Sequence, residues 1–179
     1  MNFGERLKFN DMETMKHVCA ICYADFTSHS FNYLCTTIEG GDIFYTKIST
    51  ATRYDDTIGI VNHCKNYLNY HNPEKWSCII DFKEFGLKHA LCINTGIKLA
   101  QLINEFGRIN HLIFINANIF LEKMLKIIKL TLAKKYHHCI HIVRPNYKFS
   151  NEVENWTYPD NNKELLTQII HGPSSLKTQ

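Results

Sequence analysis

Two short apolar runs decide the fold: Trp76–Phe82 (WSCIIDF) and Ile109–Ala117 (INHLIFINA). Each run is too short and too apolar for a surface helix and suits a buried strand. Between them, Leu87–Phe106 has apolar residues at helical spacing and is long enough to connect two parallel strands. The sequence therefore predicts that the two runs are neighbouring parallel strands, joined by a helical crossover.

The same alternation extends outward from these runs. Upstream, the sequence predicts a strand at Ile43–Ser49, after a turn at Gly40-Gly41, and a helix at Asp55–Tyr70. Downstream, it predicts a helix at Phe120–Ala133, a strand at Cys139–Val143 and a closing helix at Lys163–Ile170. This order is typical of an α/β domain with right-handed crossovers and a largely parallel sheet covered on both faces.

The N-terminal part of the chain is predicted to contain a helix at Asp11–Ala24. Asn10 followed by Glu13 resembles a capping box. Behind it, apolar residues recur at helical spacing: Met12, Met15, Val18, Cys19, Cys22 and Phe26. This spacing predicts one continuous buried stripe.

Composition limits the class of protein. The chain has 179 residues, 45% of them hydrophobic and 21% charged. These values predict a single domain, 1–179, with a core that needs no disulfide or metal. A net charge of +3 is too small to require a nucleic-acid partner. Seven cysteines without framework spacing favour reduced thiols, and no stretch resembles a secretory signal or a membrane span. We expect a cytoplasmic protein.

One string has the residue types of a metal site, Cys19-x2-Cys22-x6-His29-x5-Cys35. It offers three thiolates and an imidazole, which are ligands that tetrahedral zinc prefers. Cys19 and Cys22 also lie on the predicted helix stripe, however, where small sulfur side chains fill a core. We therefore expect no stoichiometric zinc. A small zinc or redox protein acting through these two cysteines is the distant alternative.

Other chemistry-bearing residues have ordinary structural interpretations. His137, Cys139 and His141 alternate along a predicted strand without an acidic or Cys partner at a defined spacing, which favours packing over metal binding. Asp81, at the end of a strand, either carries function or caps the following turn. The sequence has no phosphate loop, dinucleotide fingerprint, HExxH or GxSxG motif, so we expect neither an enzyme nor a cofactor.

From Trp76 to Val143 the sequence resembles the CRAL-TRIO lipid-binding domain family. The resemblance rests on the order of three segments: WSCIIDFKEFGLKHA, a long helix, and FGRINHLIFINANIFLEKMLKIIKLTLAKKYHHCIHIV, with GGDIFYTKIS upstream as the opening strand. It implies a three-layer α/β/α sandwich with a mainly parallel, mixed sheet. It also divides the chain into a short N-terminal helical segment (1–40), a core (41–143) and a C-terminal extension (144–179).

The resemblance further implies a lipid cavity between the sheet and a movable lid helix after INAN. The expected lipid-contact residues come from two strands and the lid: Cys78, Ile80, Phe82, Leu112, Phe114, Leu121, Leu125, Ile128 and Leu132. Lys123, Lys126 and Lys129 lie between the apolar residues of the lid, where they could rest on an anionic membrane.

The sequence also departs from the family. Phosphoinositide-binding members carry a Glu before the Arg that aligns with Arg108, and a Lys four residues before the end of the last strand. Gly107 and Cys139 stand at those two positions here, which argues against phosphoinositide exchange. Asn118 and Leu130 replace two prolines that the family often has.

Taken together, these observations predict a non-enzymatic protein, peripheral to membranes, that binds a lipid or other apolar ligand and transfers it at a transient membrane contact. The alternative is a protein-interaction module of the same fold, in which the cavity is filled and the surface binds a small GTPase or another signalling partner.

Overall fold

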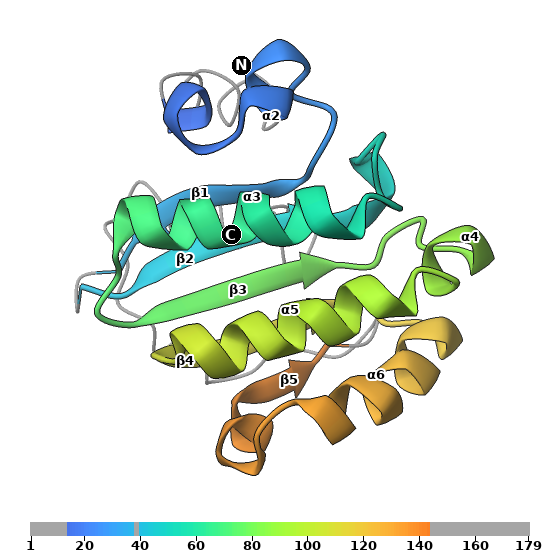
Figure 1. The fold of residues 1–179 in the computed structure, drawn as a ribbon. Helices are drawn as coiled ribbons and strands as arrows, with labels where there is room; N and C mark the ends of the chain where they lie inside the picture. The colour runs from blue at the N-terminus through green and yellow to red at the C-terminus, as the bar shows by residue number, and fades with distance from the viewer. Residues whose placement is uncertain (1–13, 38–39, 144–179) are drawn as a thin grey trace, which may run out of the picture.

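The computed structural model describes residues 14–37 and 40–143, which form one five-stranded sheet in the order β1-β2-β3-β4-β5 (Figure 1). The strands are β1 (Phe31–Thr36), β2 (Asp42–Lys47), β3 (Trp76–Asp81), β4 (Ile109–Ile115) and β5 (Ile140–Ile142). The helices are α2 (Ala20–Ala24), α3 (Thr57–His71), α4 (Leu87–Ala90), α5 (Ile93–Phe106) and α6 (Ile119–Thr131). Two 3-10 helices, η1 (Ile48–Thr50) and η2 (Lys134–Cys139), connect them.

The central prediction is confirmed, because β3 and β4 are parallel neighbours with Cys78 opposite Leu112 and Ile80 opposite Phe114. β2 also pairs in parallel with β3, and β5 pairs in parallel with β4. β1, which the sequence analysis did not predict, adds an antiparallel edge. The sheet is thus mixed and mostly parallel, as expected for the predicted α/β class.

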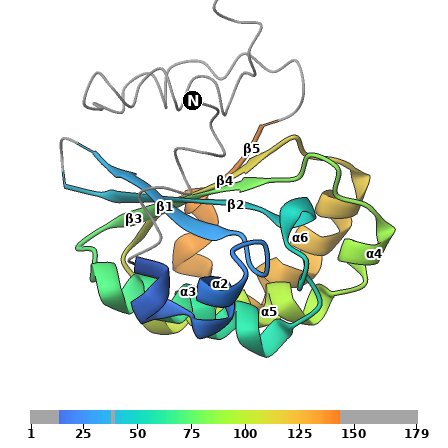
Figure 2. The ribbon, with the colours of Figure 1, turned by 90° about the horizontal axis from the view of Figure 1, so that it is seen from above.

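The two faces of the sheet bury different sets of residues. The larger cluster joins β-strand residues such as Phe44 and Cys78 to α3, α5 and α6. The smaller cluster, on the opposite face, is formed by Cys35, Ile43, Tyr45, Ile79, Ile113, Ile115 and Val143. Figure 2 shows that α3, α5 and α6 all lie on one face of the sheet. The predicted closing helix Lys163–Ile170 lies outside the described residues.

Three predicted elements need correction. The helix predicted at Asp11–Ala24 is interrupted within the described residues: 14–18 are helical, Cys19 is extended (φ −149°, ψ 104°), and α2 starts after it. The predicted helix Leu87–Phe106 is divided into α4 and α5. Cys139 belongs to η2 rather than to a strand, because the chain winds as a 3-10 helix before it enters β5.

Asp81 is a structural residue at the carboxyl end of β3. Its carboxylate accepts hydrogen bonds from the Tyr45 hydroxyl (2.9 Å), the Asn116 side-chain amide (2.7 Å) and the Lys83 backbone N–H (2.8 Å). Burial, followed by the charge of Asp81, raises the pKa of Tyr45, so this phenol keeps its proton. The bond to Lys83 is the turn cap that the sequence suggested, and the other two tie the ends of three strands together.

Candidate functional site

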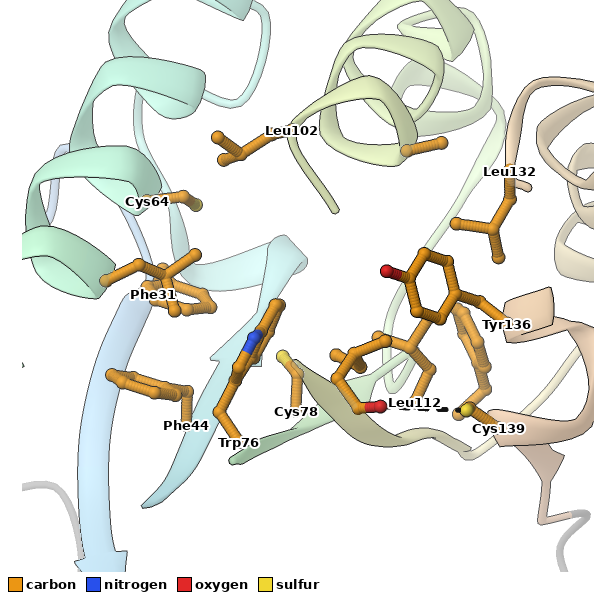
Figure 3. Packing of buried hydrophobic residues seen from close by; sticks show 14 of the residues in the cluster. Phe31, Phe44, Cys64, Trp76, Cys78, Leu102, Leu112, Leu132, Tyr136 and Cys139 are labelled. Carbon is orange, nitrogen blue, oxygen red and sulfur yellow. Dashed lines mark hydrogen bonds between the residues drawn. The ribbon is translucent and has the colours of Figure 1, made fainter. Parts of the chain in front are cut away.

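A cavity of about 170 Å³ lies between the sheet and the helices that cover it. Its floor is made by alternate residues of β2, β3 and β4, and its roof by α3, α5 and α6. Side chains point inward from both layers, as Cys78 and Leu112 on the strands and Leu102 and Leu132 opposite them show (Figure 3). Strand alternation turns every second residue of a strand toward the helices, which determines the strand residues that form the floor.

Eight of the nine expected lipid-contact residues lie in the cavity wall: Cys78, Ile80, Phe82, Leu112, Phe114, Leu125, Ile128 and Leu132. Leu121 is fully buried but does not line the cavity. Their contact with a lipid stays a prediction. The geometry establishes that the two strands and α6 face one shared space.

A large part of the cavity wall was not predicted from the sequence. α5 contributes Thr95, Gly96 and Leu99, and α3 contributes Cys64 and Leu68. The signal was present in the amphipathic spacing of both helices, but spacing alone does not say which helix covers which strand. Gly96 lets the helices approach closely, since a Cβ placed there would lie 2.8 Å from Ile128 Cδ1 on α6.

The cavity is polar at the end near the carboxyl edge of the parallel strands. Two hydroxyl pairs lie there, Ser30 with Thr46 and Thr57 with Thr95, each with an oxygen separation of 2.7 Å. Ser30, Thr46 and Thr95 line the cavity. This edge of an open α/β sheet is where ligands commonly bind.

His89 adds a buried donor to this polar end. Its Nδ1 accepts the Gly86 backbone N–H at 3.1 Å, so the neutral ring carries its proton on Nε2. Nε2 is buried and has no hydrogen-bond partner among the described residues. Burial, and then the charge of Lys88, lowers the pKa of His89, which keeps the ring neutral near pH 7. A neutral N–H donor is thus held in the cavity wall beside the rings of Tyr54 and Phe85.

The opposite end of the cavity is apolar and its polar atoms are paired. The Trp76 indole donates to the Gly107 carbonyl at 2.8 Å, while its ring lines the cavity with Leu112 and Leu132. Burial raises the pKa of the cavity thiols Cys64 and Cys78, so both are protonated and poor nucleophiles. The described wall therefore suits burial of an apolar body rather than covalent chemistry.

α6, the expected lid, is hydrogen-bonded at both ends. At its start, the Asn118 side chain accepts the Phe120 and Leu121 N–H groups and donates to the Phe85 carbonyl. At its end, the Asn104 side chain donates to the Thr131 carbonyl (2.8 Å) and accepts the Ala133 N–H (2.9 Å). Movement of α6 as a unit would have to break these side-chain bonds.

The outer face of α6 combines lysines with exposed apolar residues. Lys123 and Lys126 are exposed and Lys129 is half-buried, and none of the three lines the cavity. Beside them, Leu130 is 87% exposed, and Ile119 and Ile127 are also exposed. Leu87 and Leu91, in and directly after the neighbouring α4, are exposed as well. The lysines were predicted from the sequence, and the outward apolar residues were not.

The two predicted metal-like groups behave differently. His137, Cys139 and His141 are not brought together, because the His137 ring contacts the Lys129 and Leu132 carbonyls and His141 contacts His111. Cys19, Cys22 and His29 do meet, and the fourth member of their cluster is His63 of α3. Cys35 lies instead on the opposite face of the sheet.

The bulge in β1 explains the position of Cys35. Tyr33 pairs with Phe44 and Cys35 pairs with Ile43, so the register shifts between Tyr33 and Cys35. One extra residue in a strand reverses the facing of the residues that follow it. Cys35 thus joins Ile43 in the smaller cluster, away from Cys19 and Cys22.

Comparison with known proteins supplies a family and a fold. The model of the CRAL/TRIO domain family matches residues 35–161. The crystal structure of Sfh5 matches with a TM-score of 0.58 and 7% sequence identity, over 78% of this chain and 55% of that chain. This chain thus spans about half the length of Sfh5, and at this identity the likeness concerns the fold alone. None of the curated proteins matches the sequence.

Within residues 14–37 and 40–143, no helix combines the length and the apolar character that a membrane crossing requires.

Proposed function

This chain belongs to the CRAL/TRIO domain family, and from that premise we propose that it binds one apolar, lipid-like ligand in the cavity between the sheet and α5 and α6. Proteins of this family are in general non-enzymatic and bind lipids or small apolar molecules. The single observation that carries the proposal is the apolar cavity, lined from both layers by the residues that the family resemblance selects.

The size of the cavity limits the ligands that fit while α6 stays in its present position. The cavity volume is about 170 Å³. Pockets that hold drug-sized ligands start at roughly 300 Å³. A small apolar body fits this space, whereas a longer lipid requires the roof to move. We infer that α6 moves, because it forms part of the roof and its outer face is exposed; opening lifts Leu121, Met124 and Leu125 out of the core.

The polar end gives the ligand an orientation. The ligand would have one hydrogen-bond acceptor, such as a carboxyl, ester or hydroxyl oxygen. This oxygen would accept the hydrogen bond from His89 Nε2, and the apolar part of the ligand would lie against Trp76 and Leu132. Apolar burial supplies most of the binding free energy, at about 25 cal/mol per Å² removed from water. The acceptor satisfies a donor that is otherwise buried without a partner among the described residues.

Exchange of the ligand is proposed to occur at an anionic membrane. The outer face of α6 presents Lys123 and Lys126 beside Ile127 and Leu130, the pattern of a helix that lies on a membrane surface. Each lysine near such a surface contributes about 1 kcal/mol of attraction. Contact there would place the membrane directly over the helix that has to move.

Lipid content of the natural chain tests the proposal. The full chain is expressed in a lipid-rich host and examined by native mass spectrometry and lipid extraction. We expect a stoichiometric apolar ligand with the wild type and with Ile127→Trp, whose position faces outward on α6. The double variant Leu125→Trp and Ile128→Trp fills the cavity and should lose the ligand while its circular dichroism spectrum stays that of a folded protein.

The same experiment has a distinct outcome if the cavity holds no ligand. In a protein whose cavity never holds a ligand, the wild type yields no extractable lipid, and the double variant loses only the roughly 1–3 kcal/mol of stability that overpacking costs. The interaction module with a filled cavity would give this outcome. The open space beneath α6 favours ligand binding over that alternative.

A further inference from the structure

A group of four metal-ligating side chains shares one member, His29, with the wall of the ligand cavity. Cys19 is the N-cap of α2, Cys22 lies within α2, His29 precedes β1, and His63 projects from α3. Their ligand atoms, two Sγ and two ring nitrogens, all lie within 4.8 Å of one another. Residues from three separate segments of the chain therefore converge on one point.

The distances match those around a tetrahedral zinc ion. Zn–S bonds of about 2.3 Å and Zn–N bonds of about 2.0–2.1 Å place a sulfur and a nitrogen ligand about 3.6 Å apart across a tetrahedral angle. His29 Nδ1 lies 3.6 Å from Cys19 Sγ and 3.3 Å from Cys22 Sγ. His63 Nδ1 lies 3.5 Å from Cys22 Sγ.

Hydrogen bonds set the His63 ring for coordination. His63 Nε2 lies 2.7 Å from the Phe31 carbonyl oxygen. That oxygen can only accept, so Nε2 carries the proton and the lone pair of Nδ1 faces the sulfurs. His29 also turns Nδ1 toward the sulfurs, and its Nε2 lies 3.9 Å from the Asp56 carboxylate, which is beyond hydrogen-bond distance. Metal-bound histidines usually donate to a carbonyl or carboxylate, as His63 does here.

The local backbone also favours a metal ligand at Cys19. The helix stops at this residue, and the Cys22 backbone N–H donates to Cys19 Sγ at 3.5 Å. A continuous helix was the reason to expect no zinc, and this interruption removes that reason. Two cysteines in a Cys-x2-Cys spacing together with two histidines form the Cys2His2 ligand set of structural zinc sites.

From this geometry we infer that Cys19, Cys22, His29 and His63 form a structural Zn²⁺ site. Binding forms two Zn–S and two Zn–N bonds and releases the two thiol protons to the solvent. Two thiolates balance the charge of the ion, so the buried centre is neutral. All four positions are filled by protein, which leaves no position for a substrate.

The position of the site gives it a role in the fold. The ion would join the segment that contains α2 to α3, and would fix the start of β1 through His29. His29 itself and the next two residues along the chain, Ser30 and Phe31, line the ligand cavity. The site would therefore hold one wall of the cavity in place, and one of its four ligands is part of that wall.

Elemental analysis of the reduced full chain, purified with zinc present, tests the site. We expect about one zinc per chain and a Kd below about 0.1 µM. Cys22→Ser and His63→Asn should each weaken zinc binding by 100-fold or more. Cys35→Ala and His71→Asn are the matched controls and should keep the metal, because Cys35 is on the other face of the sheet and His71 lies two turns along α3.

Cobalt substitution tests the site in the wild-type chain, so the result does not depend on whether the variants fold. With Co²⁺ in place of zinc, the wild type should show intense visible bands of a tetrahedral ion and a near-ultraviolet thiolate band. A wild type that takes up no zinc overturns the inference, as does a Cys19–Cys22 disulfide that persists under reduction. Retention of the metal by both ligand variants, or a six-coordinate cobalt spectrum, would also overturn it.

Discussion

His89 is the side chain on which the proposed orientation of the ligand depends. Its Nδ1 accepts the Gly86 N–H, and its buried Nε2–H has no partner among the described residues. No sequence pattern identifies this residue, because its role depends on the ring being turned into the cavity wall. The structure therefore predicts that substitution of His89 changes the affinity for a ligand with a hydrogen-bond acceptor.

Replacement of His89 by Leu should weaken binding of a fluorescent long-chain fatty acid about five- to tenfold, because a hydrogen bond contributes roughly 1 kcal/mol. His89→Gln, which keeps a side-chain N–H donor, should restore part of the affinity. Diphenylhexatriene has no acceptor and should bind all three proteins equally. Fluorescence titration measures each affinity. Equal loss of both probes would show that His89 shapes the cavity rather than contacting the polar group.

At the scale of single elements, α6 has two chemically different faces. Its inner face supplies Leu125 and Ile128 to the cavity, and its outer face exposes lysines and Leu130. Asn118 and Asn104 hold its two ends by hydrogen bonds to neighbouring segments. In the proposed function, opening of α6 has to break these hydrogen bonds and lift Leu121, Met124 and Leu125 out of the core.

Replacement of Lys123, Lys126 and Lys129 by Glu should slow ligand transfer from anionic vesicles at least tenfold, because several favourable charge contacts with the surface become repulsive. The free energy of unfolding should change by less than about 1 kcal/mol, since surface charges contribute little to stability. Transfer is measured between fluorescent donor and acceptor vesicles.

A matched triple variant distinguishes the effect of this surface on transfer from the effect of net charge. Lys65, Lys75 and Lys98 are exposed on other segments, and their replacement by Glu changes the net charge by the same amount. We expect normal transfer from this control. Equal slowing in both triple variants would mean that overall charge, and not the outer face of α6, governs the contact with the membrane.

At the scale of the whole molecule, the N-terminal segment shares the large apolar cluster with the sheet through Val18 and has further attachments of its own. β2, β3 and β4 are joined by parallel ladders and bury the large apolar cluster. The segment around α2 reaches α3 through the Cys2His2 group and through the Asn66 side chain, which donates to the Val18 carbonyl at 2.8 Å. The two parts should therefore differ in their dependence on metal.

Chelation of zinc under reducing conditions should expose residues 14–30 first. We expect their amide protons to exchange at least tenfold faster, while amides of β3 and β4 keep their protection, because the apolar core does not depend on the ion. Hydrogen exchange measured by mass spectrometry gives both rates. Added zinc should reverse the change. Equal loss of protection throughout the chain would show that the metal holds the whole domain together.

The amino-acid pattern alone predicts the α/β class, the parallel pairing of Trp76–Phe82 with Ile109–Ala117, and three of the four α6-side residues expected at the cavity, Leu125, Ile128 and Leu132. These features follow from local periodicity, since alternation fixes the face of a strand and helical spacing fixes the inner side of a helix. The break at Cys19, the bulge that turns Cys35 away and the position of His63 beside His29 arise from tertiary contacts. His63 lies far from His29 along the chain, so no local spacing joins them. They meet because α3 packs across β1, and packing between distant segments is a property of the folded chain.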